Sequence, residues 1–146
     1  MNLRSFFVVP AYTFFYWGFT LKKDTYPSFI NYFKLGEGNL EIPITLEINR
    51  KKYSAKLRVA RINNKGKTKT RSSIVYPERD VVQISYEKER DTLKALRKLV
   101  IYSYATTIDK SKPKIKELLE FIHTGENNFQ VKVISKQETD FDAMFN

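Results

Sequence analysis

The sequence predicts a single domain of mixed, mainly β structure, with short helices beside the strands. Its 146 residues suit one hydrophobic core and are too few for two. Hydrophobic residues make up 42% of the chain, so a fully disordered protein is excluded. Two neighbouring segments, 40–48 and 53–60, alternate apolar and polar residues with the period of a half-buried strand.

The segment from Phe6 to Phe19 is mostly apolar and follows Arg4, as in a signal peptide. It contains Pro10 and Gly18, however, and it has no small-residue cleavage site. It is also shorter than the roughly 20 residues that a membrane-spanning helix needs. We therefore expect this segment to belong to the core, and we expect a cytoplasmic protein, or a nuclear one in a eukaryote.

A short helix is predicted from Tyr26 to Phe33. Pro27 favours the first turn of a helix, Ser28 is a possible cap, and Gly36 is a typical end. This helix precedes the two alternating segments and so precedes the main strands.

The two alternating segments predict an antiparallel hairpin around a polar turn at 49–52. The following segment, 63–73, has no apolar side chain and predicts a long projecting loop. Strand character returns at 74–76 and at 81–86, on either side of Pro77.

The C-terminal third predicts two helices and one strand. The first helix covers 87–104, and the second runs from a cap at Ser111 to a stop at Gly125. Segment 129–133 predicts a strand, and the acidic segment 136–146 predicts a tail or a linker to a further domain. The apolar residues at helical spacing are Leu93, Leu96, Leu99 and Val100 in the first helix, and Ile115, Leu118, Leu119 and Ile122 in the second.

The positive charge of the chain is concentrated in one segment. The chain has 26 Lys and Arg against 16 Asp and Glu, a net charge of +10, and no acidic residue lies between Glu47 and Glu78. Ten basic residues lie in that gap, which leaves 16 basic and 16 acidic residues elsewhere. A binding site for a polyanion is the natural inference. The ten are Arg50, Lys51, Lys52, Lys56, Arg58, Arg61, Lys65, Lys67, Lys69 and Arg71.

Catalytic patterns are missing from the sequence. The absence of cysteine and the single histidine exclude disulfides, thiolate catalysis, Cys-ligated zinc and multi-histidine metal sites. No acidic residue is followed two positions later by Lys, and His123 is followed by Thr124 and Gly125, so two common nuclease patterns are absent. Segment 66–68 lacks the upstream glycine of a nucleotide-binding loop. We expect no enzyme activity and no cofactor, and we expect His123 to lie at a helix end.

Two motifs resemble a known family. Gly66-Lys67-Thr68-Lys69-Thr70-Arg71 resembles a Gly-Lys-Thr-Arg-Asn-Glu segment in the N-terminal effector domain of EcoRII, and Tyr26-Pro27-Ser28 resembles the Tyr-Ile-Pro-Ser helix start of that domain. The order of elements between the motifs also agrees. The family is the B-three type of DNA-binding pseudobarrel, found in plant transcription factors, in EcoRII and BfiI, and in McrB-like restriction subunits of the LlaJI type. Over residues 5–105, the resemblance implies an open seven-stranded pseudobarrel flanked by short helices.

In that family two arms enter the major groove of DNA. The resemblance implies a first arm at Gly18–Thr25 and a second arm at Arg61–Ser73. Lys69 stands where the family has Arg, and Thr70-Arg71 stands where it has Asn-Glu. The base preference of this chain therefore cannot be transferred from the family. The residues implied to contact DNA from the arms are Lys22, Lys23, Asp24, Thr25, Arg61, Asn63, Asn64, Lys65, Lys67, Thr68, Lys69, Arg71 and Ser72.

Other residues of the basic segment allow further interpretations. Lys56 and Arg58 share one face of a strand behind the second arm and suit phosphate contacts. Asn63 and Asn64 could contact adenine, although tandem asparagines are more often turn formers.

The sequence thus predicts a non-catalytic, sequence-specific domain for double-stranded DNA, formed by residues 1–135, in a restriction system whose nuclease or motor is another domain or subunit. The alternative is binding of RNA or single-stranded nucleic acid through exposed aromatic residues, although their density favours the core. A membrane surface is disfavoured because the basic residues lie on β-loops. The aromatic residues in question are Phe6, Phe7, Phe14, Phe15, Tyr16 and Trp17.

Overall fold

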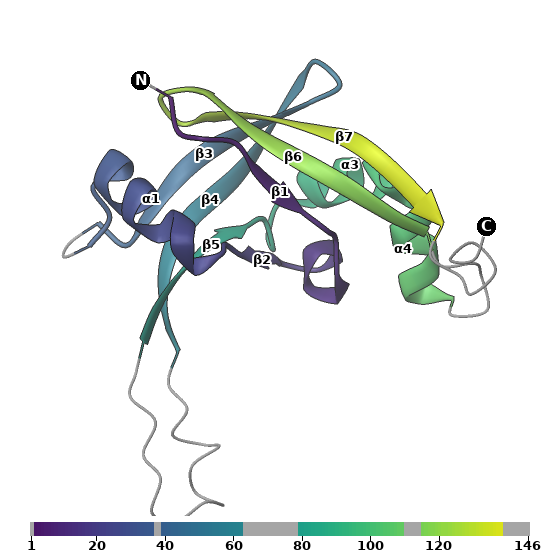
Figure 1. Cartoon of the computed structure of the whole chain (residues 1–146), viewed down its shortest axis with the longest axis horizontal. Coiled ribbons are helices and arrows are strands. Elements are labelled where there is room, and N and C mark those ends of the chain that lie inside the picture. The colour runs from purple at the N-terminus through teal and green to yellow at the C-terminus, as the bar shows by residue number, and fades with distance from the viewer. Residues whose placement is uncertain (1, 37–38, 63–78, 110–114, 139–146) are drawn as a thin grey trace, which may run out of the picture.

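The computed structural model of the chain describes residues 2–36, 39–62, 79–109 and 115–138, and the backbone alone at positions 61, 62, 79, 80, 115, 137 and 138. This part of the chain forms a seven-stranded sheet that curls into an open half-barrel, with short helices beside it (Figure 1). The predicted fold class, a mainly β open pseudobarrel with flanking helices, is confirmed. The strands are β1 (Phe6–Val8), β2 (Gly18–Thr20), β3 (Glu41–Ile48), β4 (Lys51–Ile62), β5 (Arg79–Ser85), β6 (Ile115–Gly125) and β7 (Asn128–Glu138), and the helices are α1 (Tyr26–Phe33), α3 (Arg90–Leu99) and α4 (Ile101–Ile108).

The strands lie in the order β1-β6-β7-β3-β4-β5-β2. Neighbouring strands are antiparallel except β3 and β7, which are parallel. The two outermost strands, β1 and β2, follow one another in the sequence. Their side chains Phe6 and Phe19 are in contact, with ring centroids 6.5 Å apart, so the curl of the sheet brings its two edges together.

The β3–β4 hairpin confirms the predicted antiparallel pair. Its turn contains two residues, Asn49 and Arg50, because Ile48 pairs directly with Lys51. Both turn residues have positive φ, 51° and 70°, which is the conformation that a two-residue turn between twisted strands requires. The turn is therefore shorter than the predicted 49–52.

Phenylalanine side chains fill the inside of the half-barrel. Phe6 of β1 stacks on Phe121 of β6 at 5.1 Å between centroids, and Phe29 of α1 stacks on Phe129 of β7 at 6.1 Å. The expectation that residues 6–19 belong to the core holds for only some of their side chains. Of the aromatic residues named above, Phe6, Phe14 and Phe15 are buried, Phe7 and Tyr16 are exposed, and Trp17 is half-buried.

The predicted helix from Ser111 to Gly125 is wrong, because residues 115–125 form strand β6. The side chains that point inward from β6 alternate strictly, but two of them are polar, Glu117 and His123, with Leu119 and Phe121 between them. Leu118 and Ile122 are only half-buried on the other face. The apolar residues therefore mimic a helical period, although the backbone has the period of a strand.

His123 lies in the core rather than at the end of a helix. Its side chain is 2% exposed, its Nδ1 accepts a hydrogen bond from the backbone N–H of Leu3 at 2.9 Å, and its Nε2 lies 2.7 Å from the carbonyl oxygen of Glu126. The first bond requires Nδ1 to be an acceptor, so Nε2 carries the proton and donates to Glu126. The imidazole links the N-terminal segment to the β6–β7 turn.

The predicted helix over 87–104 is divided into α3 and α4 at Val100, which is fully buried. The second helix begins without a side-chain cap of its own. Instead, the buried carboxylate of Glu117 on β6 accepts a hydrogen bond from the backbone N–H of Ser103 at 2.6 Å. An acceptor supplied by another element thus stabilises the new helix start.

Two further boundaries differ from the sequence prediction. Helix α1 has the predicted range, but Thr25 rather than Ser28 precedes it, and it ends at Lys34, whose φ is 53°, rather than at Gly36. Strand β7 continues to Glu138, so residues 136–138 belong to the sheet.

Within the described part of the chain, no helix is long and apolar enough to cross a membrane.

Candidate nucleic-acid interface

The two predicted arms leave the sheet at the same end. Strand β4 leads into the second arm at Ile62, and β5 returns from it at Arg79, with Ile62 and Arg79 paired. Strand β2 is antiparallel to β5, and the N–H of Leu21 continues this pairing with the carbonyl of Val82. The chain after Leu21 therefore runs toward the end of β5 where β4 enters the second arm. The described strands therefore lead into both predicted arms at the same end of the sheet.

A row of polar side chains crosses the sheet at the base of the arms. In register, Thr20 of β2 pairs with Gln83 of β5, Gln83 pairs with Arg58 of β4, and Arg58 pairs with Glu41 of β3. Paired residues lie on the same face of a sheet. These four residues, which we name the polar row, thus share the face opposite to the buried Leu57.

Hydrogen bonds order the side chains of the polar row. The Nε of Arg58 donates to Oε1 of Gln83 at 2.9 Å, and Nε2 of Gln83 donates to Oγ1 of Thr20 at 3.2 Å. Trp17 lies beside the row, with the guanidinium carbon of Arg58 5.5 Å from the centre of its ring. Arg58 is held on two sides, while the two terminal nitrogens of its guanidinium make no hydrogen bond within the described residues.

Gly18 sets the position of Trp17 and of the first arm. It has a φ of 145°, and a Cβ atom at this position would lie 2.0 Å from the carbonyl oxygen of Ile84. Only glycine allows β2 to approach β5 this closely. The close pairing brings the start of the first arm against the polar row.

The basic residues of the first arm and of β4 differ in their surroundings. Lys22, Lys23 and Asp24 are exposed, with a hydrogen bond of 2.6 Å from the hydroxyl of Thr25 to the carbonyl of Lys22 bracing the turn. Lys56 is also exposed, but its Nζ lies 3.1 Å from a carboxylate oxygen of Glu41. Any anion that binds Lys56 must therefore compete with Glu41.

Most of the second arm lies outside the described residues. This holds for its predicted contacts Asn63, Asn64, Lys65, Lys67, Thr68, Lys69, Arg71 and Ser72. For Arg61 the backbone is described, and it pairs with Asp80 at the end of the β4–β5 ladder. The structure thus brings together Lys56, Arg58 and the base of both arms.

Sequence reasoning missed Glu41 and Gln83 altogether. It considered Trp17 only for stacking of single-stranded bases and Thr20 only as part of the first arm, because a polar row becomes visible only when the register of four strands is known. The alternation within each strand was the available signal, since Thr20 and Gln83 stand between buried apolar residues.

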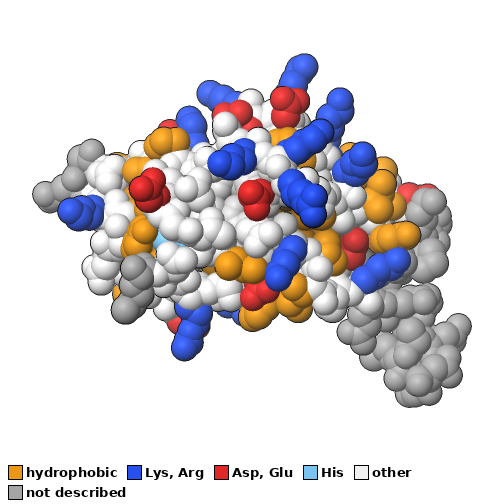
Figure 2. All heavy atoms as spheres, turned by 90° about the horizontal axis from the view of Figure 1, so that it is seen from above, with side chains coloured by type: hydrophobic (Ala, Val, Ile, Leu, Met, Phe, Trp, Pro, Cys, Tyr) orange, Lys and Arg blue, Asp and Glu red, His pale blue; other side chains and the backbone are white. Residues whose placement is uncertain are grey.

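The face of the molecule seen in Figure 2 has mixed charge. Figure 2 shows the molecule from above, with Lys and Arg side chains scattered and acidic side chains between them. Within the described residues there is no group of three His, Cys, Asp or Glu side chains that could hold a metal ion. Burial raises the pKa of Tyr86 well above its ordinary value, and its hydroxyl donates to the carbonyl of Phe14 at 2.6 Å, which is a structural role.

Comparisons of the chain with protein-family models, with curated proteins and with solved structures found no match. The resemblance to the B-three-type family therefore stays a prediction.

Proposed function

We propose that this chain is a non-catalytic domain that recognises a sequence in double-stranded DNA with its two arms. The observation that carries the proposal is the exit of both arms from the same end of the sheet, beside the polar row. One of these arms belongs to the segment that contains all the excess positive charge. Two segments that start from the same end of a sheet could contact both walls of a major groove, which is about 12 Å wide.

The two groups of residues have different roles in this proposal. Lys56 and the lysines of the first arm neutralise phosphates and release counterions, which supplies affinity without regard to sequence. Arg58 is held by Gln83 and Trp17, so its guanidinium is already oriented toward an acceptor. Side chains of the second arm read base edges. A nuclease in another domain or subunit of a restriction system supplies cleavage, and a motor is a further partner in such a system.

The aromatic residues offer less support for the alternative, binding of single-stranded nucleic acid. Stacking of bases requires rings with a free face. Tyr16 is already in contact with Tyr12 at 4.5 Å between centroids and with the guanidinium of Arg97 at 5.3 Å, and Trp17 has Arg58 over its ring. Base stacking would have to displace these contacts.

The test is a selection of bound duplexes from a random pool, followed by affinity measurements on the enriched site, on a scrambled duplex and on the matching single strand and RNA. We expect one enriched motif and a duplex affinity well above that for single strands. A pool without a motif, together with equal or tighter binding of single strands or RNA, would overturn the proposal in favour of the alternative. Incubation of supercoiled plasmid with the chain and Mg²⁺ should leave the plasmid intact.

A further inference from the structure

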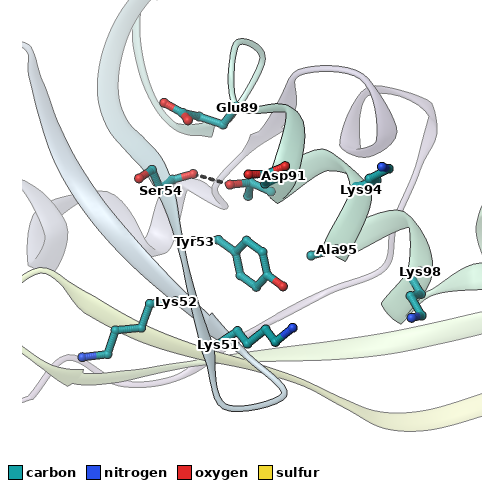
Figure 3. Close-up of a pocket in the computed structure, with 10 residues that line it drawn as sticks. Lys51, Lys52, Tyr53, Ser54, Glu89, Asp91, Lys94, Ala95 and Lys98 are labelled. Atoms are coloured by element: carbon teal, nitrogen blue, oxygen red, sulfur yellow. Dashed lines mark hydrogen bonds between the residues drawn. The ribbon is translucent and has the colours of Figure 1, made fainter.

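A groove of about 520 Å³ lies between the β3–β4 hairpin and helix α3. Its walls are the start of β4, residues 51–54, and residues 89–98 around α3. The hydroxyl of Thr92 donates to the carbonyl of Ser54 at 2.6 Å and fixes the helix against the strand (Figure 3). The volume is within the range of small-molecule sites, roughly 300–1,000 Å³. Strand β4 leads into the second arm at its other end, at Ile62, about 26–36 Å along the strand from these residues at ~3.3 Å per residue.

Four lysines line this groove, although the side chain of Lys52 points away from Tyr53 in Figure 3. Lys51 and Lys52 come from the hairpin, and Lys94 and Lys98 from successive turns of α3. Within the described residues none of the four has a carboxylate oxygen within 4.0 Å of its ammonium group. Lys94 and Lys98 are four positions apart on a helix, where like charges repel and cost stability. Both walls of the groove thus carry lysines that form no close ion pair within the described residues.

The groove also has an aromatic and an acidic part. In Figure 3 the ring of Tyr53 lies in the middle, with Lys51 and Lys98 on one side of it and Glu89 and Asp91 on the other. The lysines suit the phosphates of a ligand. The half-buried ring offers a surface for a flat apolar group, and the carboxylates can accept hydrogen bonds from hydroxyl or amino groups.

From this arrangement we propose that the groove binds a nucleotide, with phosphates on Lys51, Lys94 and Lys98 and the base against Tyr53. A molecule with phosphates at one end and a flat ring with hydroxyl and amino groups at the other matches the groove along its length. The site is separate from the arms, and the proposal does not depend on DNA recognition.

The proposal is tested by calorimetric titration of the full chain with ATP, pyrophosphate and adenosine at low salt. We expect ATP to bind more tightly than pyrophosphate, and adenosine not to bind. The double variant Lys94→Gln with Lys98→Gln should weaken ATP and pyrophosphate at least about tenfold, since each lost charge-assisted hydrogen bond is worth about that factor. Tyr53→Leu should reduce ATP affinity about fivefold or more and leave pyrophosphate unchanged.

Arg90→Gln is the matched control, because Arg90 is an exposed residue of the same helix that does not line the groove. We expect it to bind ATP within twofold of the wild-type chain, and thermal melts should show that all variants fold. No binding of ATP at millimolar concentration, or an equal loss in the control, would overturn the proposal. Pyrophosphate binding as tight as ATP would contradict the role of Tyr53. Displacement of ATP by a duplex would contradict a separate site.

Discussion

Glu41 is the residue of the polar row whose removal should strengthen DNA binding. Its carboxylate lies 3.1 Å from Nζ of Lys56, and both side chains are half exposed. In the proposed complex, phosphates approach this face, so the carboxylate both occupies Lys56 and repels the ligand. The substitution Glu41→Gln keeps the shape of the side chain and removes its charge.

The size of the effect follows from the exposure of the pair. A solvent-exposed ion pair stabilises the free protein by about 0.2–1 kcal/mol. In the wild-type chain this free energy is lost when Lys56 leaves Glu41 to bind a phosphate, and in the Glu41→Gln variant it is not. Removing the carboxylate also removes a repulsion of about 0.3 kcal/mol for a phosphate at about 15 Å in water. Together they predict about two- to tenfold tighter binding at low salt, and a gain that shrinks as salt rises. The free energy of unfolding should change by less than about 1 kcal/mol.

Fluorescence anisotropy with a labelled duplex measures this effect, and Glu47→Gln is the control. Glu47 lies on the same strand and the same face as Glu41, about 20 Å farther from the arms at ~3.3 Å per residue. The same loss of charge there should change duplex affinity less than twofold. If Glu41→Gln binds DNA no better than the wild-type chain, or if both variants gain equally, the face of the polar row is not the DNA-binding face.

Three more predictions concern the sheet and the second arm. Gly18→Ala should lower the free energy of unfolding by at least about 2 kcal/mol in urea titrations, because its Cβ would overlap a backbone carbonyl of β5; a change below about 0.5 kcal/mol would contradict the geometry. Burial raises the pKa of Tyr86 above the value of about 10 that the residue has in the unfolded chain, so the protonated hydroxyl contributes its full stabilisation below about pH 10. This stabilisation is lost as the pH rises through the raised pKa. The free energy of unfolding of Tyr86→Phe should therefore fall less steeply at alkaline pH than that of the wild-type chain. Lys69→Ala or Arg71→Ala should each cost ~1–3 kcal/mol of binding free energy on the preferred duplex and relax the base preference of the chain. Lys56→Ala should weaken binding to the preferred and the scrambled duplex alike. If every variant loses the same affinity on both duplexes, the second arm contacts only phosphates.

Local patterns predicted the elements whose side chains obey a single period. The β3–β4 hairpin is an example, because one face of both strands is apolar and its turn contains Asn49, which tolerates positive φ. Helix α1 is another, since Pro27 restricts its first turn. In such segments, propensity and packing favour the same structure.

Strand β6 could not be predicted in this way, because two of its inward side chains are polar and form hydrogen bonds with other parts of the fold. Glu117 accepts from the start of α4, and His123 joins the N-terminal segment to the β6–β7 turn. Ser103 is 14 positions from Glu117, Leu3 is 120 positions from His123, and Glu126 comes within reach of His123 through the β6–β7 turn. The polar row has the same origin: Arg58 was identified from the charge pattern, but its partners Gln83 and Trp17 follow from strand register.

The affinity of the whole chain for duplex DNA as a function of salt concentration tests the central claim most directly. If both arms and β4 together contact about six phosphates, the logarithm of the affinity should fall with the logarithm of the salt concentration at a slope near −5. A slope near zero, or no duplex binding at low salt, would contradict the claim that this fold presents its positive charge to DNA.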